Sequence, residues 1–454
     1  MADEKEKFSK DPIHSVAKVP IDAVKTTVEM EKDGAKVIGQ AILYPLHKRR
    51  SILDFFWRSK RGVITGAADN DPAGIVTYTQ TGAIAGFKLL WMCVLAWPLL
   101  IAVEEMSARI GVVAKKGINQ VIKENYGKSW AYLAALIVLV CNTFTIGADI
   151  AAMADIAHVL TGLASFIFVI ILGGLFFYLL WKSGYRNVSR YLFLITPIFL
   201  LYVVSALLLD VPWGQALRDT FIPPLRSFNS SLIFIAVAFL GTTLSPYLIY
   251  WETTQQIEEK RSVSEIKNET RGTATGMFFS QFITYFIVVA AAAAFAGGYH
   301  EFSSAKEAAL ALKPLGNLSF LFFSIGILGA GLLAIPVLSA STGYTISETF
   351  GWKKGLDKSF SEAKGFYLVM SLSLIIGLAI ASFGFNPILA LIYSQVLNGI
   401  LMPVLILLLL LITNNKKIMG EYTNKIFTNF FGILALLITL GFDTMMLIDW
   451  LRKF

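Results

Sequence analysis

The chain carries little charge for its length. Of its 454 residues, only 15% are Asp, Glu, Lys or Arg, whereas a soluble domain has about 25%. A soluble globule with so few charged side chains would not cover its own surface. Intrinsic disorder is excluded as well, because disorder requires low hydrophobicity and 56% of these residues are hydrophobic. The composition therefore indicates a polytopic membrane protein.

Cysteine is almost absent from the sequence. Cys93 and Cys141 are the only two cysteines, and both lie in apolar runs, so neither a disulfide framework nor a thiolate metal cluster is expected. The sequence also contains no phosphate-binding loop, nucleophile elbow or zinc-type spacing of Cys and His. A membrane enzyme or a receptor is therefore disfavoured, and we expect no resident cofactor.

Long apolar runs, by contrast, recur along the chain. A helix needs about 20 apolar residues to cross the hydrocarbon core of a bilayer. The first 50 residues have no such run and no signal-peptide core, so they are interpreted as a cytoplasmic tail. Eleven later segments are long and apolar enough to span, and they cover residues 62–86, 89–112, 130–158, 160–181, 191–209, 231–254, 275–298, 318–345, 365–384, 387–412 and 428–448.

The net charge of +8 comes from 39 basic and 31 acidic residues. We attribute the excess to cytoplasmic loops rather than to binding of nucleic acid, because Lys and Arg are retained on the cytoplasmic side of membranes. With the tail inside, the internal loops hold eighteen Lys and Arg residues and the external side holds seven. This bias predicts a cytoplasmic N-terminus and an extracellular C-terminus, in agreement with an odd number of helices.

Two of the predicted spans are interrupted by polar residues, glycine and proline. The first contains Gly66-Ala67-Ala68-Asp69-Asn70-Asp71-Pro72-Ala73-Gly74, and the sixth contains Gly241-Thr242-Thr243-Leu244-Ser245-Pro246. Proline removes an amide donor and clashes with the preceding turn, so each helix should break there. Broken helices at matching places in two halves are typical of inverted-repeat secondary transporters. We expect a tail (1–50), two five-helix repeats (51–210 and 211–412) and an appended eleventh helix (413–454).

The first break places Asp71 at membrane depth, with Asp69 beside it. A carboxylate inside a bilayer is costly and is interpreted as functional by default. Carbonyl groups that are released at such a break also serve as cation ligands. The alternative is that Asp71 only caps the second half of the helix, since Asp is a preferred N-cap and proline a preferred first residue.

Polar residues in two later spans are further candidates for a site. At the second break Thr242, Thr243 and Ser245 offer hydroxyl groups and carbonyls, although small hydroxyl residues also allow helices to pack closely. The tenth span carries the amide side chains of Gln395 and Asn398 in an otherwise apolar run. Hydrogen bonding between helices is the alternative role for these amides.

The remaining charges within the predicted spans have less specific interpretations. Glu104, Glu105 and Arg109 are expected to pair with each other at the spacing of four residues on one helix, and this structural role is favoured over a functional one. Asp149, Asp155 and His158 of the third span belong either to a proton relay or to a structural network. Glu252 lies one and a half turns beyond the second break and is expected to be a solvated charge.

These motifs resemble those of the Nramp family of divalent metal transporters. The first break reads Asp71-Pro72-Ala73-Gly74 where the family has Asp-Pro-Gly-Asn. The second reads Thr242-Thr243-Leu244-Ser245-Pro246-Tyr247 where the family has Ala-Thr-Val-Met-Pro-His, and Ser394-Gln395-Val396 is similar to the family's Ser-Gln-Val. The resemblance covers residues 60–412 and continues into the eleventh helix. It implies an all-α integral membrane protein with a leucine-transporter-like five-plus-five inverted repeat, in which helices one and six are broken.

The resemblance also implies a set of metal ligands. The aspartate of the family's site is retained as Asp71, and the other expected ligands are Ala68, Thr242, Ser245 and Gln395. The partners of the chain are then divalent metal ions, which are its substrate, and the lipid bilayer. A monomeric transport unit in the plasma membrane is expected.

Four positions depart from the family pattern. Gly74 replaces the asparagine ligand, and Ser245 replaces the methionine ligand. Tyr247 replaces the proton-linked histidine, and Ala152 replaces a glutamate of the third helix. This pattern is similar to the Nramp-related magnesium transporters, whose transport is not coupled to protons. The residues that remain for an acid network are Asp69, Asp149 and Asp155.

Ligand chemistry leads to the same expectation. A thioether is a soft ligand that favours transition metals, whereas carboxylate, carbonyl and water ligands suit Mg²⁺ and Mn²⁺. Glycine at 74 and serine at 245 enlarge the cavity, and Mg²⁺ prefers to keep several of its waters. We therefore expect inward transport of Mg²⁺ and Mn²⁺ by alternating access, without protons.

Two other readings stay open on the sequence alone. One is an ordinary proton-coupled importer of Mn²⁺ and Fe²⁺, which the combined loss of methionine, histidine and glutamate disfavours. The other is an amino-acid symporter on the same fold, whose broken helix would bind a substrate carboxylate. Asp69 and Asp71 would repel such a substrate.

Overall fold

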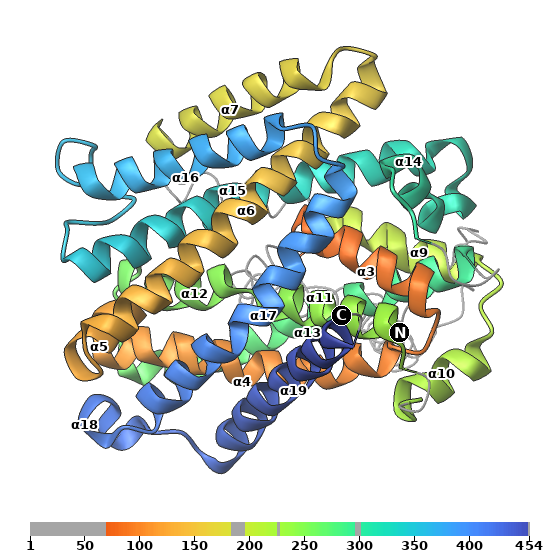
Figure 1. Ribbon diagram of the computed structural model, residues 1–454. Coiled ribbons are helices and arrows are strands. Elements are labelled where there is room, and N and C mark those ends of the chain that lie inside the picture. The colour runs from red at the N-terminus through yellow and green to blue at the C-terminus, as the bar shows by residue number, and fades with distance from the viewer. Residues whose placement is uncertain (1–69, 183–195, 225–227, 296–300, 453–454) are drawn as a thin grey trace, which may run out of the picture. The chain divides into compact units, whose positions relative to one another are not determined.

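Long apolar helices make up the part of the chain that the computed structural model describes, residues 70–182, 196–224, 228–295 and 301–452 (Figure 1). No strand occurs in these ranges, which confirms the predicted all-α class. The helices are α3 (Pro72–Ala85), α4 (Leu90–Ala114), α5 (Ile118–Asn125), α6 (Lys128–Thr161), α7 (Ser165–Lys182), α9 (Leu200–Leu208), α10 (Trp213–Phe221), α11 (Ser230–Thr243), α12 (Pro246–Glu258), α13 (Ile266–Ala294), α14 (Ala305–Ala308), α15 (Ser319–Phe350), α16 (Lys364–Ser382), α17 (Pro387–Thr413), α18 (Lys416–Met419) and α19 (Ile426–Leu451). Short 3₁₀ turns cover Thr196–Phe199, Val263–Glu265, Ala309–Leu318 and Gly420–Tyr422.

Eight of the described helices are long and apolar enough to cross a membrane, and a bent pair brings the number to nine. The predicted total of eleven stays a prediction. The start of the predicted first span (62–69) and part of the predicted fifth span (191–195) lie outside the described residues. The predicted tail lies outside them as well, and the described residues all belong to one compact unit.

The predicted spans agree with the observed helices except around the fourth and fifth. The predicted fourth span began at residue 160, but α6 continues to Thr161 and ends at Gly162, which has a positive φ of 76°. Glycine adopts this left-handed conformation without a Cβ clash, so the helix stops there. After the predicted fifth span the chain turns by 119° into α10, a helix that the sequence analysis missed.

The predicted break in the sixth span is confirmed. Helix α11 ends at Thr243, and α12 begins at Pro246. Between them Leu244 and Ser245 adopt non-helical backbone angles, with ψ values of 60° and 133°. Proline suits the first position of a helix because its missing N–H would have no partner there. The two halves together form one membrane-spanning segment of 29 residues, Ser230–Glu258.

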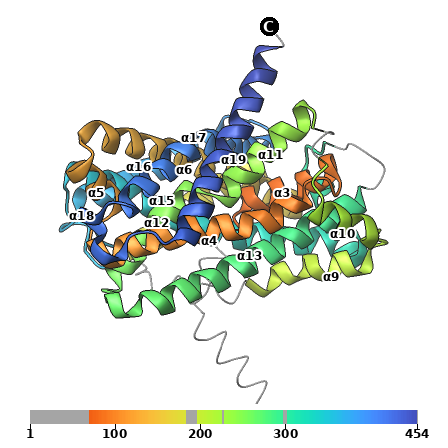
Figure 2. The same cartoon turned by 90° about the horizontal axis from the view of Figure 1, so that it is seen from below.

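Close helix crossings hold α11 against α17 and α3 against α13. A Cβ on Gly241 of α11 would overlap the backbone of α17 at the Gln395 carbonyl and the Gly399 amide. A Cβ on Gly82 of α3 would likewise overlap the backbone of α13 at the Val288 carbonyl. Figure 2 shows α13 running beside α3 and α4. Glycine therefore allows backbone-to-backbone contact at both crossings, as small residues do in membrane helix pairs.

Loops that the basic-residue pattern assigned to one side of the membrane meet at one end of the helices. The Lys115 ammonium donates to the carbonyl of Arg261. The hydroxyl of Tyr126 donates to the carbonyl of Leu411 at 2.7 Å. These contacts join the loops after α4 and α12 and connect α5 to the end of α17. Which side of the membrane this end faces stays a prediction.

Several helices present apolar side chains outward. On α19 Ile426 is 89% exposed and Leu437 59% exposed, and α7 and α16 carry similar exposed Leu, Ile and Phe residues. In water such a surface would drive aggregation, but in a bilayer it faces lipid of the same polarity. The membrane-facing surface thus includes α19, α7 and α16.

Candidate metal site at the breaks in the helices

Asp71 is the N-cap residue of α3 and has an unstrained, extended backbone conformation with φ −68° and ψ 169°. Its Oδ1 atom accepts a hydrogen bond from the backbone N–H of Gly74 at 2.5 Å, so the side chain caps the helix. Its Oδ2 atom is buried and has no hydrogen-bond partner among the described residues. The two interpretations of Asp71 therefore coexist: one oxygen caps the helix, and the other is available to a cation.

The hydroxyl groups at the second break differ in their hydrogen bonds. Ser245 Oγ donates to the carbonyl of Thr242 at 2.5 Å. This bond uses the hydrogen of the serine and leaves lone pairs on its oxygen. The Oγ1 atom of Thr242 is buried, and nothing in the described ranges bonds to it. The break thus supplies two neutral hydroxyl oxygens that have lone pairs free to coordinate a cation.

A hydrogen bond joins α3 and α11 directly. Thr243 Oγ1 donates to the carbonyl of Phe239 at 2.8 Å, so the Tyr78 hydroxyl must be the donor in its 3.1 Å contact with Thr243 Oγ1. The Tyr78 ring also packs edge-on against the Phe239 ring, with centroids 5.1 Å apart. Helix α3 is thereby held against the last turn of α11.

Helix α17 brings amide groups to the same region. Gln395 is fully buried, and its Oε1 atom accepts a hydrogen bond from Asn398 Nδ2 at 2.8 Å. Its Nε2 atom donates to Ser394 Oγ at 3.2 Å. The crossing at Gly241 places the Gln395 backbone next to the residue that precedes Thr242. Gln395 is therefore adjacent to the second break, although its side chain bonds within its own helix.

A second carboxylate lies close to the first. Asp149 of α6 is fully buried and interacts electrostatically with Asp71 and with the backbone of Ala73. Neither of its carboxylate oxygens has a hydrogen-bond partner within the described segments. Asp155 lies six residues further along α6, about 9 Å along the axis and 120° around it, is partly exposed, and interacts with His158 instead. The helix therefore places Asp149 near Asp71 and separates Asp155 from both.

The other predicted site positions are distributed as follows. Gly74, Tyr247 and Ala152 are all buried, on α3, α12 and α6. The predicted positions Ala68 and Asp69 lie outside the described residues. In the part of the chain that is described, no group of three or more His, Cys, Asp or Glu side chains comes together. A cation at the breaks would therefore rely on two carboxylates and on neutral oxygens.

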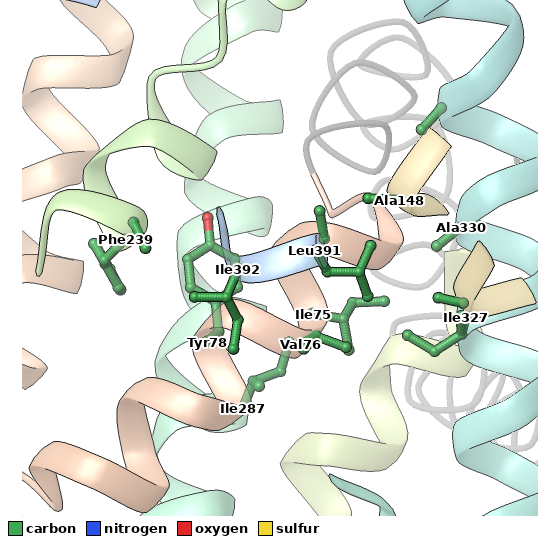
Figure 3. Packing of buried hydrophobic residues seen from close by; sticks show 14 of the residues in the cluster. Ile75, Val76, Tyr78, Ala148, Phe239, Ile287, Ile327, Ala330, Leu391 and Ile392 are labelled. Carbon is green, nitrogen blue, oxygen red and sulfur yellow. The ribbon is translucent and has the colours of Figure 1, made fainter. Parts of the chain in front are cut away.

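Apolar side chains surround the first half of α3 (Figure 3). Ile75 and Val76 belong to one buried cluster with Leu391 of α17, Ile327 of α15 and Ala148 of α6. Such surroundings have a low effective dielectric constant, which strengthens the attraction between a carboxylate and a cation. A cation is therefore stabilised in this apolar region only next to the carboxylates.

Two charges away from the breaks test the remaining interpretations. The predicted Glu105–Arg109 pair is confirmed, with Arg109 donating to Glu105 Oε2 at 2.9 Å. The interpretation of Glu252 as a solvated charge is wrong. Glu252 is only 4% exposed and accepts hydrogen bonds from Gln256 at 3.1 Å and Thr273 at 3.3 Å. Glu252 thus links α12 to α13. This role could not be predicted from the sequence, because it depends on α13 lying beside α12.

The sequence analysis missed several buried polar residues. Gln281 and Thr284 of α13 are 4% and 0% exposed, and Gln80 and Thr77 of α3 are similarly buried. The side-chain polar atoms of these residues have no hydrogen-bond partner in the ranges described. The sequence does show the amide residues Gln80 and Gln281 within apolar helices, which could have marked them as candidates. Which face of its helix each residue occupies could be learned only from the structure.

The fold is shared with known transporters. The manganese transporter of Eremococcus coleocola superimposes with a TM-score of 0.69 at 17% identity, covering 85% of each chain. The structure of MhsT in complex with L-phenylalanine superimposes with a TM-score of 0.57 at 14% identity, covering 87% of this chain and 98% of that one. These likenesses establish the leucine-transporter-like class of fold for the described helices.

The sequence identifies the family within that class. The family model described as natural resistance-associated macrophage protein-like matches residues 62–449, and the chain belongs to this family, Nramp. Relatives include the divalent metal cation transporter MntH of Yersinia pestis, which is 27% identical over 413 residues and is matched over 86% of this chain and 94% of its own. The divalent metal cation transporter MntH of Verminephrobacter eiseniae is 25% identical over 407 residues, covering 85% of this chain and 88% of its own. The suspected resemblance is confirmed.

Proposed function

We propose that this Nramp-type divalent metal transporter imports Mg²⁺ and Mn²⁺ by alternating access and does so without moving protons. The observation that carries the proposal is the donor set at the breaks. It consists of the free Oδ2 atom of Asp71, the nearby carboxylate of Asp149 and the hydroxyl oxygens of Thr242 and Ser245. All of these are hard oxygen donors.

Serine at position 245 is central to the choice of ion. Its oxygen stands where the family pattern has a thioether, and the site gains no sulfur from elsewhere on α12, whose residues Pro246–Glu258 contain no Met or Cys. Carboxylate and hydroxyl oxygens suit Mg²⁺ and Mn²⁺, whereas sulfur favours softer transition metals. The donor chemistry therefore supports Mg²⁺ alongside Mn²⁺.

The lack of proton coupling rests on two substitutions. Tyr247 stands at the position of the family's histidine, and the tyrosine side chain titrates near pH 10 in its unperturbed state. Ala152 stands at the position of a glutamate and cannot titrate. Asp149 is the acid next to Asp71 within the described residues, and the proposal requires that its proton does not cross the membrane with the ion.

The orientation that we propose for the chain in the membrane follows from the distribution of Lys and Arg among the loops. The end of the helices where α5 and α18 lie is proposed to face the cytoplasm, with the N-terminus on that side and the C-terminus outside the cell. The transport unit is proposed to be a single chain in the plasma membrane. Mg²⁺ and Mn²⁺ are its substrates, and no resident cofactor is invoked.

An amino-acid symporter is the competing function on this fold, because MhsT is a structural neighbour whose structure contains L-phenylalanine. Two buried carboxylates, Asp71 and Asp149, would meet the carboxylate of such a substrate. Like charges that are buried near one another repel strongly, because the effective dielectric constant is low. The site therefore favours a cation.

Uptake into proteoliposomes tests the proposal. Wild-type protein should load vesicles with Mg²⁺, followed by an enclosed Mg²⁺-sensitive dye, and Mg²⁺ should compete with Mn²⁺ for entry. Empty vesicles and an Asp71→Asn variant serve as controls. Uptake of Mn²⁺ without any Mg²⁺ uptake or competition would refute the Mg²⁺ assignment.

A further inference from the structure

We infer that Gln281 and Thr284 of α13 bind the water shell of the transported ion and thereby tune its selectivity; this inference rests on the proposed function. No sequence motif marks either residue. Their position and their unused hydrogen-bonding groups carry the argument.

The register of α13 against α3 places Gln281 beside Asp71. Asn70 Nδ2 donates to Ser280 Oγ at 3.2 Å, so the residue before Asp71 meets the residue before Gln281. Twelve residues after Asn70, Gly82 lies directly against the backbone of Val288. The two helices therefore run in the same direction between these contacts, and Gln281 is at the level of Asp71.

Both side chains project from the face of α13 that packs on α3. Val288 marks that face through its contact with Gly82. Thr284 and Gln281 lie four and seven residues before Val288, and residues at these spacings share one side of a helix. The two side chains therefore lie between α13 and the first turns of α3.

Neither side chain has found a partner in the described part of the chain. Gln281 is 4% exposed, and neither its Oε1 nor its Nε2 atom has a hydrogen-bond partner in the described residues. Thr284 is fully buried, and its Oγ1 atom likewise has no hydrogen-bond partner there. Buried polar groups are almost always hydrogen-bonded, to protein or to ordered water. An amide left bare in an apolar helix pair therefore indicates that a polar ligand enters this region.

A hydrated cation is the ligand whose chemistry fits. Water on a cation directs its oxygen at the metal, so it offers only hydrogen-bond donors to the protein. The site must then supply acceptors beyond the direct ligands, and Gln281 Oε1 and Thr284 Oγ1 are two such atoms. Mg²⁺ gives up its waters reluctantly, so its recognition depends more on such acceptors than that of Mn²⁺.

The test compares Mg²⁺ and Mn²⁺ uptake kinetics of Gln281→Leu, Thr284→Val and wild-type protein in proteoliposomes. Gln281→Leu should raise the KM for Mg²⁺ about tenfold, the effect of losing one hydrogen bond to a charged complex. The KM for Mn²⁺ should rise less, so that the ratio of the two KM values increases about threefold. Gln281→Asn keeps an amide oxygen and should restore part of the Mg²⁺ affinity.

Thr275→Val is the matched control for Thr284→Val. Thr275 lies on the same helix, and its hydroxyl donates only to the carbonyl of Arg271 within that helix. This control should leave both KM values unchanged. Thermal unfolding of every variant in detergent shows whether the helix packing is intact.

The outcomes separate the inference from the proposed function. If wild-type protein takes up no Mg²⁺, the proposed function fails, and the inference is then judged on Mn²⁺, whose KM must still rise in Gln281→Leu. If wild-type protein takes up Mg²⁺ but Gln281→Leu leaves both KM values within twofold, the inference is overturned. An equal loss for both ions with lowered thermal stability assigns Gln281 to packing and also overturns it.

Discussion

The carboxylate of Asp71 is divided between two tasks by its contact with Gly74. One oxygen accepts the Gly74 amide at 2.5 Å and closes the first turn of α3, while the other oxygen is buried without a partner in the described structure. Capping fixes the side chain in place before any ion arrives. The helix start therefore also orients the anionic ligand.

Removing the charge of Asp71 should abolish transport without unfolding α3. Asparagine caps helices as well as aspartate does, so Asp71→Asn keeps the bond to Gly74. The ion then loses its nearest charged ligand, which we expect to cost about 3 kcal/mol and hence to lower uptake by roughly 100-fold. Initial rates of Mg²⁺ and Mn²⁺ uptake, with protein content matched, check this. Near-wild-type uptake by well-folded Asp71→Asn would remove Asp71 from the site.

Restoring the family ligands should change which ions are carried. Gly74→Asn together with Ser245→Met fills space that retained waters would occupy and adds a sulfur ligand. Mg²⁺ transport should weaken, while Mn²⁺ and especially Cd²⁺ gain, because a thioether prefers soft ions. The two effects should not add, since both positions adjoin one site.

Parallel measurement of Mg²⁺, Mn²⁺ and Cd²⁺ uptake distinguishes the possible results for this double variant. A uniform loss for all three ions would mean that Gly74 and Ser245 serve helix packing. An unchanged ratio among the ions would refute their role as ligand positions. Only a shift toward Cd²⁺ supports it.

The crossing of α11 and α17 should be sensitive to a single methyl group. Gly241→Ala places a Cβ onto the backbone of Gln395 and Gly399, and such overpacking costs about 1–3 kcal/mol. We expect a lower unfolding temperature in detergent and reduced uptake, because Thr242 moves relative to Gln395. Gly326→Ala on α15 is the control, since a Cβ there meets no atom within 4 Å. Equal stability of the two variants would show that the crossing tolerates a wider separation.

The break between α11 and α12 could be predicted from sequence because its cause is local. Pro246 cannot continue a helix, and the residues before it are polar, so the position of the second break follows from bond geometry and hydrogen bonding alone. The capping role of Asp71 follows in the same way from the proline after it. The family resemblance then added which of these residues are proposed as metal ligands.

Contacts between helices could not be predicted in this way. Glu252 reads as a solvated charge until α13 is placed beside it, and its partner Thr273 is 21 residues away. Gln281 gains meaning only from the register in which α13 lies on α3. The bend that leads into α10 was missed as well, because that helix is short and amphipathic rather than apolar.

The absence of proton coupling is the central claim of the account, and one recording tests it directly. Vesicles containing the protein, a Mn²⁺-sensitive dye and a pH-sensitive dye are given external Mn²⁺ or Mg²⁺ with the membrane potential clamped. The account predicts entry of the metal while the internal pH stays at the level of protein-free vesicles. Acidification that follows metal entry and disappears in Asp149→Asn would contradict it and would assign the proton to the carboxylate beside Asp71.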